Sequence, residues 1–169
     1  MIIDPRFNGP PDSGNGGVTC GLLATAVDLE LPEVTLRVPP PMGRELRLEG
    51  NLLYDGDLLV AEVKEGTVDV TPPPSVGVEE ARAARARFAG AHGHPFPTCF
   101  VCGPDHPTGL GLMAGSVRAG VVAVDWTPDT DDPVMVWAAL DCPGGWSSDV
   151  VERPMVLGRL ACRIDALPT

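Results

Sequence analysis

The sequence has little positive charge and no long hydrophobic run. Twelve Lys and Arg residues stand against 23 Asp and Glu residues, so the net charge is -11, and Lys64 is the only lysine. A surface that acidic repels nucleic acid and anionic lipid, although one local electropositive spot still admits a small anionic ligand. No apolar run approaches the ~20 residues of a membrane-spanning helix. The sequence therefore predicts neither a nucleic-acid partner nor a membrane partner.

We expect neither a targeting signal nor the disulfide framework of a small secreted protein. Its first residues, MIIDPRFNG, contain no basic region and no long apolar stretch, so we expect no signal peptide. The cysteines are five, an odd number: Cys20, Cys99, Cys102, Cys142 and Cys162. Reduced thiols in a cytoplasm are the simplest interpretation. With 169 residues, the chain can form one domain, or two small ones that share a core.

Several catalytic signatures are missing as well. The sequence has no P-loop, no serine nucleophile elbow and no H-E-x-x-H motif. Cys142 is a poor candidate for a nucleophile, because no histidine follows it and the three upstream histidines share one loop.

What is present predicts an α+β fold. Apolar residues recur near the 3.6-residue period over 15–29, which predicts a helix. Residues 33–71 alternate as strands do, with a break at PPPMG and a hairpin signal at YDGD, where Asp-Gly favours positive φ. A Pro-rich linker then leads to a short helix in VEEARAARARFAG.

The second half repeats this plan with fewer strands. We expect a loop over 91–109, two strands within 110–129, a helix over 133–150 capped by Asp132, and a strand within 153–166. The first half has three or four strands after its helix, whereas the second has one. The missing strands would leave sheet edges unpaired, which favours self-association as a homodimer, or instability.

Turn residues give way to a helix at Asn15, Gly16 and Gly17. The first N–H groups of a helix carry partial positive charge and have no partner inside the helix. Glycines let another group approach that backbone, so a carbonyl oxygen gaining negative charge would be stabilised there. On local sequence alone, an ordinary polar cap with a flexible entry loop is the simpler interpretation.

A single carboxylate, Asp141, stands among apolar residues in VWAALDCPGG. A carboxylate in such a helix destabilises the fold unless it is paired or functional. It could act as a general base or as a nucleophile on an acyl group. It could equally cap the CPGG turn at the end of the helix.

Two further cysteines could hold a metal ion. Cys99 and Cys102 form a Cys-x-x-Cys-Gly knuckle, and His92, His94 and His106 lie close by in the sequence. A strong zinc signal requires two paired knuckles, and the sequence has one. Two packed thiols in a tight turn are therefore the preferred interpretation, and we expect no metal and no cofactor.

Two stretches carry a resemblance to the hotdog fold, in which an antiparallel sheet wraps around a central helix. They are GNGGVTCGLLATAVD and TLRVPPPMGRELRLEGNLLYDGDLLVAEV. The two-half plan resembles double-hotdog proteins of the acyl-CoA thioesterase superfamily, and CFVCGP and VWAALDCPGGW resemble uncharacterised actinobacterial thioesterase-like members. The resemblance implies a first hotdog half over 1–75, a linker with a short helix over 76–95, and a second, C-terminally short half over 96–169.

The resemblance also implies a composite site. Hotdog thioesterases of the phenylacetyl-CoA type have His-Gly-Gly at the helix start and an acid nine residues after the His, and the acid and amides that act together come from different subunits. Here Asn15 replaces that His, and Ala24 stands nine residues later. In the second half, Asp141 is nine residues after Asp132, but no Gly-Gly precedes it. One half keeps the amides and the other keeps the carboxylate.

The implied reaction is hydrolysis of an acyl-CoA or a related thioester. Gly16 and Gly17 would polarise the thioester carbonyl, Asp141 would activate water or attack directly, and Asn15 would orient the carbonyl or the water. An apolar acyl slot would be lined by Cys20, Leu23, Met135, Trp137 and Trp146. The candidates for binding the CoA phosphates are Arg44, Arg153 and Arg159.

Two other functions remain open at this point. The change from His to Asn is compatible with a non-catalytic protein that binds an acyl group or acyl-CoA. A hotdog dehydratase is disfavoured, because that chemistry usually requires a histidine in the site and neither predicted helix contains one.

Overall fold

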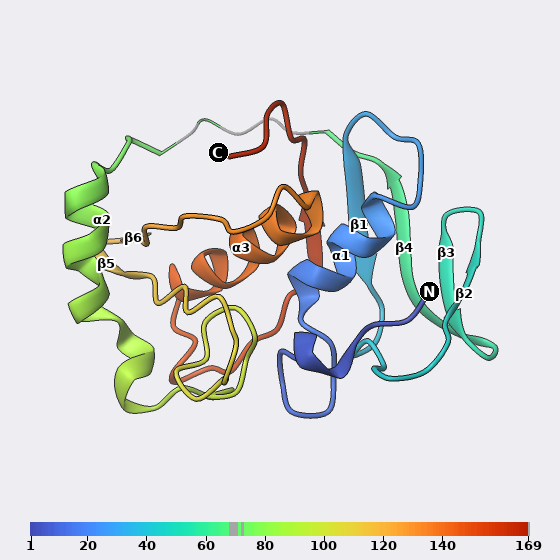
Figure 1. The fold of residues 1–169 in the computed structure, drawn as a ribbon, viewed down its shortest axis with the longest axis horizontal. Helices are drawn as coiled ribbons and strands as arrows, with labels where there is room; N and C mark the ends of the chain where they lie inside the picture. Colours follow the sequence, from blue (N-terminus) through green and yellow to red (C-terminus); the bar gives the residue numbers. More distant parts are fainter. Residues whose placement is uncertain (68–70, 72, 169) are drawn as a thin grey trace.

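The protein is an α+β chain built around one antiparallel sheet. A computed structural model describes residues 1–67, 71 and 73–168. Within these residues, a five-stranded sheet has the order β2–β3–β4–β1–β7 (Figure 1). Its strands are β1 (Pro32–Leu36), β2 (Arg47–Glu49), β3 (Leu52–Asp55), β4 (Leu58–Glu65) and β7 (Arg159–Ala161).

The first long helix, α1 (Gly16–Ala24), begins where the sequence predicts. The Asn15 side chain caps it, because its Oδ1 accepts the Val18 N–H at 2.9 Å. The prediction that the helix continues to residue 29 is wrong. The helix ends at Ala24, and Thr25 is its C-cap, with its N–H donating to the Gly21 carbonyl at 2.9 Å.

The meander after α1 forms as predicted. β1 pairs antiparallel with β4, and β4 pairs with β3 across a hairpin in which Gly56 has a φ of 59°. The predicted β-structure up to residue 71 and the linker after it extend into residues 68–70 and 72, which lie outside the described residues.

The short helix α2 (Val78–Ala84) lies in the predicted linker over 76–95, and the second half contains the hairpin of β5 (Gly115–Arg118) and β6 (Val121–Ala123) and the helix α3 (Pro133–Trp146). Single 3-10 turns are η1 (Pro5–Phe7), η2 (Arg85–Arg87) and η3 (Ala89–His92). Asp132 caps α3, as predicted, by accepting the Val134 N–H at 2.9 Å. The helix ends at Trp146, short of the predicted residue 150, but it continues through the CPGG segment. Asp141 therefore lies inside α3 and does not cap its end.

The strand predicted within 153–166 is β7, and it joins the sheet of the first half. It pairs antiparallel with β1, with Glu33 opposite Ala161 and Thr35 opposite Arg159. In the ribbon, β7 lies beside β1 and close to the α1–α3 pair (Figure 1). The two halves therefore contribute to one sheet.

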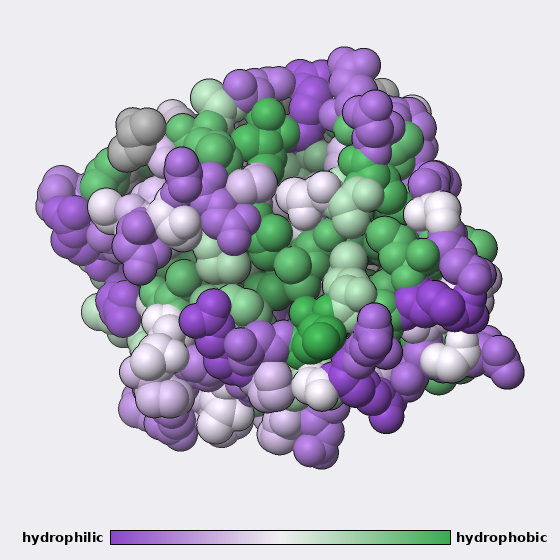
Figure 2. All heavy atoms as spheres, turned by 45° about the vertical axis from the view of Figure 1, so that its right-hand side comes forward, coloured by the Kyte–Doolittle hydropathy of each residue, from purple (hydrophilic) through white to green (hydrophobic). Residues whose placement is uncertain are grey.

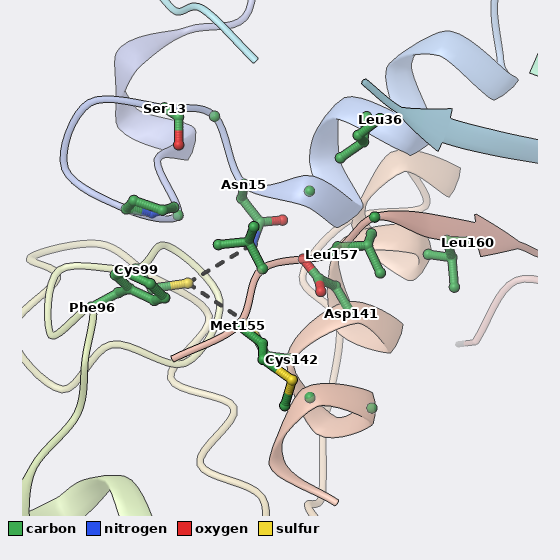
Figure 3. Close-up of a pocket in the computed structure, with 18 of the residues that line it drawn as sticks. Ser13, Asn15, Leu36, Phe96, Cys99, Asp141, Cys142, Met155, Leu157 and Leu160 are labelled. Carbon is green, nitrogen blue, oxygen red and sulfur yellow. Dashed lines mark hydrogen bonds between the residues drawn. The ribbon is translucent and has the colours of Figure 1, made fainter. Parts of the chain in front are cut away.

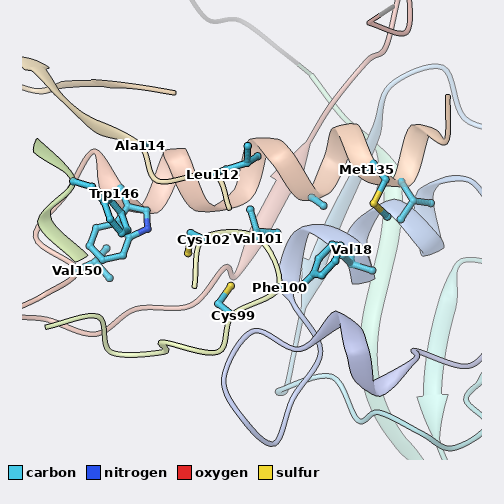
Figure 4. Close-up of a cluster of buried hydrophobic side chains, with 13 residues drawn as sticks. Val18, Cys99, Phe100, Val101, Cys102, Leu112, Ala114, Met135, Trp146 and Val150 are labelled. Carbon is cyan, nitrogen blue, oxygen red and sulfur yellow. The ribbon is translucent and has the colours of Figure 1, made fainter. Parts of the chain in front are cut away.

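Two apolar cores lie on opposite sides of the helix pair. One contains Leu23 of α1, Trp137 of α3 and the inner face of the sheet, including Leu53 and Val60. The other lies between α3 and the segment 99–114 and includes Trp146 (Figure 4). On the face shown in Figure 2, hydrophobic residues gather across the middle and hydrophilic residues surround them.

The helices are short compared with the thickness of a bilayer. Among the described residues, no helix combines the length and the apolar character that a membrane crossing requires.

Candidate functional site

The site lies where α1 and α3 cross closely. A Cβ atom on Gly17 would lie 2.6 Å from the Trp137 carbonyl oxygen and 2.8 Å from Asp141 Cβ. A Cβ atom on Gly21 would lie 2.9 Å from Trp137 Cβ and 3.0 Å from Val134 Cα. A later residue of α1 therefore contacts an earlier part of α3, so the two helices run antiparallel. The glycines permit this approach because they have no side chain.

The approach places Asp141 at the N-terminus of α1. The Gly17 N–H donates a hydrogen bond to Asp141 Oδ2 at 2.9 Å. Gly16 comes directly before it, and its N–H makes no hydrogen bond to any residue that the structure describes. One carboxylate and one unpaired amide are therefore neighbours at a helix N-terminus, where the partial positive charge of the helix is largest.

Burial governs the protonation of this carboxylate. It raises the pKa of Asp141 to about 6, against the opposing effect of the hydrogen bond from Gly17. A carboxyl group with a pKa in this range can both accept and return a proton near neutral pH.

Asp141, Asn15 and Gly16 line one cavity of about 660 Å³ (Figure 3). This volume is within the range of small-molecule sites. Gly17 lies behind them, buried against α3. The structure thus brings together the four residues that the sequence assigns to chemistry.

The lining of the cavity differs from the predicted acyl slot. Trp146 is the one residue of that predicted set that lines it. Cys20, Leu23 and Trp137 lie in the core beneath the sheet, and Met135 lies in the second core. These four side chains are buried among protein atoms and do not face the cavity.

Other apolar residues form the wall, and they come from β1, α3, β7 and the segment that leads into β7 as well as from the loop that contains Phe96. Among the cavity-lining residues are Leu36, Phe96, Leu140, Met155, Leu157 and Leu160. Leu157 packs directly over the α1 N-terminus, since a Cβ atom on Gly16 would lie 2.6 Å from Leu157 Cβ. An apolar chain entering this cavity would therefore lie next to the carboxylate and the unpaired amide.

Two arginines reach the cavity. Arg159 lines it, as does Arg37, which the sequence analysis did not select. Arg37 pairs with Glu62, and Arg159 lies 3.8 Å from Glu33. Of the other predicted phosphate ligands, Arg44 pairs with Asp55 and does not line the cavity, and Arg153 also lies outside it.

A cluster of sulfur atoms borders the same cavity. The Sγ atoms of Cys99, Cys102 and Cys142 all lie within 4.8 Å of one another. Cys99 and Cys142 are 3.7 Å apart, and the Asn15 amide nitrogen lies 3.8 Å from Cys99 Sγ (Figure 3). His94 Nε2 lies 3.3 Å from Cys102 Sγ.

The pKa values of the clustered thiols shift in different directions. Hydrogen bonds from Cys102 and Cys142 lower the pKa of the Cys99 thiol well below its usual range. Hydrogen bonds to Cys102 and Cys99, together with burial, raise the pKa of Cys142. Burial lowers the pKa of His94, which favours the neutral imidazole.

No protein-family model, curated protein or solved structure matches the chain. No named relative therefore assigns a role to any residue. The functional argument rests on the arrangement of Asp141, Gly16 and Gly17 within the cavity.

The sequence analysis missed Cys142 as a partner of the Cys99–Cys102 knuckle, whereas it named His94 among three nearby histidines. Cys142 is 40 residues from Cys102, and no spacing rule links a helical cysteine to a distant knuckle. His94 stands five residues before Cys99 in the sequence, and its Nε2 lies 3.3 Å from Cys102 Sγ. His106 instead places its Nε2 2.9 Å from the Arg6 carbonyl oxygen, away from the sulfur atoms.

Proposed function

We propose that the protein hydrolyses an acyl-CoA or a related acyl thioester at the composite site between α1 and α3. The observation that carries the proposal is the 2.9 Å hydrogen bond between the Gly17 N–H and Asp141 Oδ2 beside an apolar cavity. The carboxylate and the amides come from segments 124 residues apart. A role limited to capping α1 would not require a cavity of this size at the contact.

The arrangement of the halves supports a double-hotdog relationship. In each half a capped helix leads to a strand, α1 to β1 and α3 to β7. The two helices run antiparallel in contact, and the two strands are antiparallel neighbours. Two like units facing each other across a twofold axis would produce this arrangement. The homodimer expected from unpaired sheet edges stays a prediction.

The proposed reaction begins with the thioester carbonyl next to the α1 N-terminus. Asp141 accepts a proton from a water molecule, and the resulting hydroxide attacks the carbonyl carbon. The Gly16 N–H donates to the oxygen that becomes negative, while the Gly17 N–H holds the carboxylate in place. Collapse of the intermediate breaks the C–S bond, and the departing thiolate takes up the proton from Asp141.

The two ends of the substrate require different surroundings. The acyl chain fits the apolar wall that includes Met155 and Leu157. The phosphates of CoA require positive charge, which Arg37 and Arg159 supply at the cavity on an otherwise acidic chain.

Replacing Asp141 with Asn tests the proposal. The amide oxygen of Asn can still accept the Gly17 N–H, but the side chain cannot take a proton from water. We expect hydrolysis of a panel of acyl-CoAs to fall by ~10²–10⁴-fold, the usual contribution of a general base. Free CoA should be measured by chromatography, since thiol reagents would also react with the five cysteines of the protein.

The matched control is Asp149→Asn, an exposed carboxylate that does not line the cavity. It should hydrolyse the panel at the unmodified rate. Equal turnover by the Asp141→Asn protein and the control would exclude Asp141 as the base.

One observation favours a second function, binding without hydrolysis. The Gly17 N–H already donates to Asp141, so only Gly16 is free to polarise a carbonyl. A binding protein would be stabilised against heat by an acyl-CoA, with no release of CoA from any member of the panel.

A further inference from the structure

The sulfur cluster beside the cavity has the geometry of a metal site. Two thiolates that bind one zinc ion at ~2.3 Å in a tetrahedron lie about 3.8 Å apart. The Cys99 and Cys142 sulfur atoms are 3.7 Å apart, and Cys102 lies within 4.8 Å of both. A small closure of the triangle would bring all three sulfur atoms to the distances that zinc requires.

The main chain around Cys99 and Cys102 forms a tight turn that aims both thiols the same way. The Gly103 N–H donates to the Cys99 carbonyl at 2.8 Å. A Cβ atom on Gly103 would collide with the main chain of Pro97 and Cys99, lying 2.6 Å from the Cys99 carbonyl oxygen. Glycine is therefore required after the second cysteine, as expected for a turn that converges two thiols on one point.

We propose that the protein binds one zinc ion through the thiolates of Cys99, Cys102 and Cys142, with His94 as the fourth ligand. Three sulfur atoms and one imidazole make a closed tetrahedral set, which is typical of a structural zinc site. Soft thiolate donors in this geometry favour zinc over calcium or magnesium. Binding releases the protons that remain on the thiols.

His94 must move and change its tautomer to complete the set, because its ring contacts Cys102 Sγ but does not belong to the group of donor atoms that lie within 4.8 Å of one another. Its Nδ1 accepts the Phe96 N–H at 3.0 Å, so in the neutral ring Nε2 carries the proton and donates to Cys102. Ligation through Nε2 moves this proton to Nδ1, which requires the ring to release the Phe96 amide. The three thiolates therefore supply most of the affinity, and His94 closes the site.

The ion would tie the loop that contains Cys99 to α3 at the residue after Asp141. It would also order the wall of the cavity formed by His94, Cys99 and Cys102. This role is structural and does not depend on hydrolysis of a thioester.

The test measures zinc in the full chain, purified under reducing conditions without a chelator or a polyhistidine tag. Elemental analysis should find one zinc ion per chain, and removal of the ion should lower the melting temperature. Adding Co²⁺ to the metal-free protein should produce a thiolate-to-cobalt charge-transfer band in the near ultraviolet. Absence of this band from the metal-free, unmodified protein would overturn the proposal. This test does not depend on whether any variant folds.

Variants then assign the ligands. Cys142→Ser should lose the ion, and His94→Gln should retain it with at least tenfold weaker affinity. Cys162→Ser is the matched control, because Cys162 is partly buried and lies outside the cluster. The Cys162→Ser protein should keep one zinc ion per chain. Full zinc content in the Cys142→Ser protein would refute the site. Unchanged affinity in the His94→Gln protein would remove His94 from the ligand set.

A disulfide is the competing state of these sulfur atoms. If the chain purified under reducing conditions contains a Cys99–Cys142 or Cys99–Cys102 disulfide and no metal, the zinc site is excluded. Iron bound in place of zinc would contradict the choice of ion, and elemental analysis distinguishes the two.

Discussion

Replacing Gly17 with Ala should separate the two helices that build the site. The added methyl group would lie 2.6 Å from the Trp137 carbonyl oxygen, 2.8 Å from Asp141 Cβ and 2.9 Å from Ala138 Cα. Two of these atoms belong to the main chain of α3 and the third is attached to it. No side-chain rotation can therefore relieve the contacts, and α3 must move away from α1.

The size of the effect follows from two opposing terms. Alanine stabilises a helix by up to ~1 kcal/mol relative to glycine. Overpacking of a rigid core usually destabilises by ~1–3 kcal/mol, and the upper end applies where only main-chain movement can help. The expected net loss is about 2 kcal/mol, which for a chain of this size lowers the melting temperature by roughly 4–8 °C.

Thermal and urea unfolding of Gly17→Ala measure this loss, with Gly144→Ala as the matched control. Gly144 lies in α3, and a Cβ atom there would meet no atom within 4 Å beyond its chain neighbours and the nearby backbone of its own helix. The control should be as stable as the unmodified protein or slightly more stable. Equal stability of the two variants would refute the close packing of α1 on α3, and with it the contact between Gly17 and Asp141.

Two other substitutions test local features of the site. Asn15→Ala removes the cap on the Val18 N–H and should lower the free energy of unfolding by ~1 kcal/mol in urea titrations. Asn15→Ser should restore most of that stability. No loss of stability in the Ala variant would show that the cap does not stabilise the fold. Arg159→Ala should weaken acyl-CoA binding up to about fivefold in calorimetry at low salt, the effect of losing one exposed ion pair. Arg44→Ala, which breaks a pair with Asp55 away from the cavity, should bind normally, and equal affinity of both variants would exclude Arg159 from the phosphate site.

Helix starts were predictable from sequence because capping is local. Asn15 and Asp132 each accept an N–H from a residue two or three positions later, so the signal lies within one turn of the chain. The end of α1 was not predictable from its apolar pattern. Residues after Ala24 continue that pattern, yet the helix ends there, so the pattern does not mark its end.

The pairing of Asp141 with the α1 N-terminus followed from comparing the two halves. The residues that line the cavity could not be predicted in this way, because α1 is apolar around nearly its whole circumference. Cys20 and Leu23 therefore had no polar face against which to be oriented, and both turned out to face the core. The partner of β7 was equally hidden, since three residues carry too little pattern to specify a strand more than 120 positions away.

The pairing of β1 with β7 has a consequence for synthesis of the protein. β1 leaves the ribosome long before β7 exists, because 122 residues separate Leu36 from Arg159. At roughly 5–20 residues per second, one edge of β1 waits about 6–25 s for its partner. During that interval a hydrogen-bonding edge is open to other nascent chains, so this protein should depend on translation speed and on chaperones more than its modest size implies.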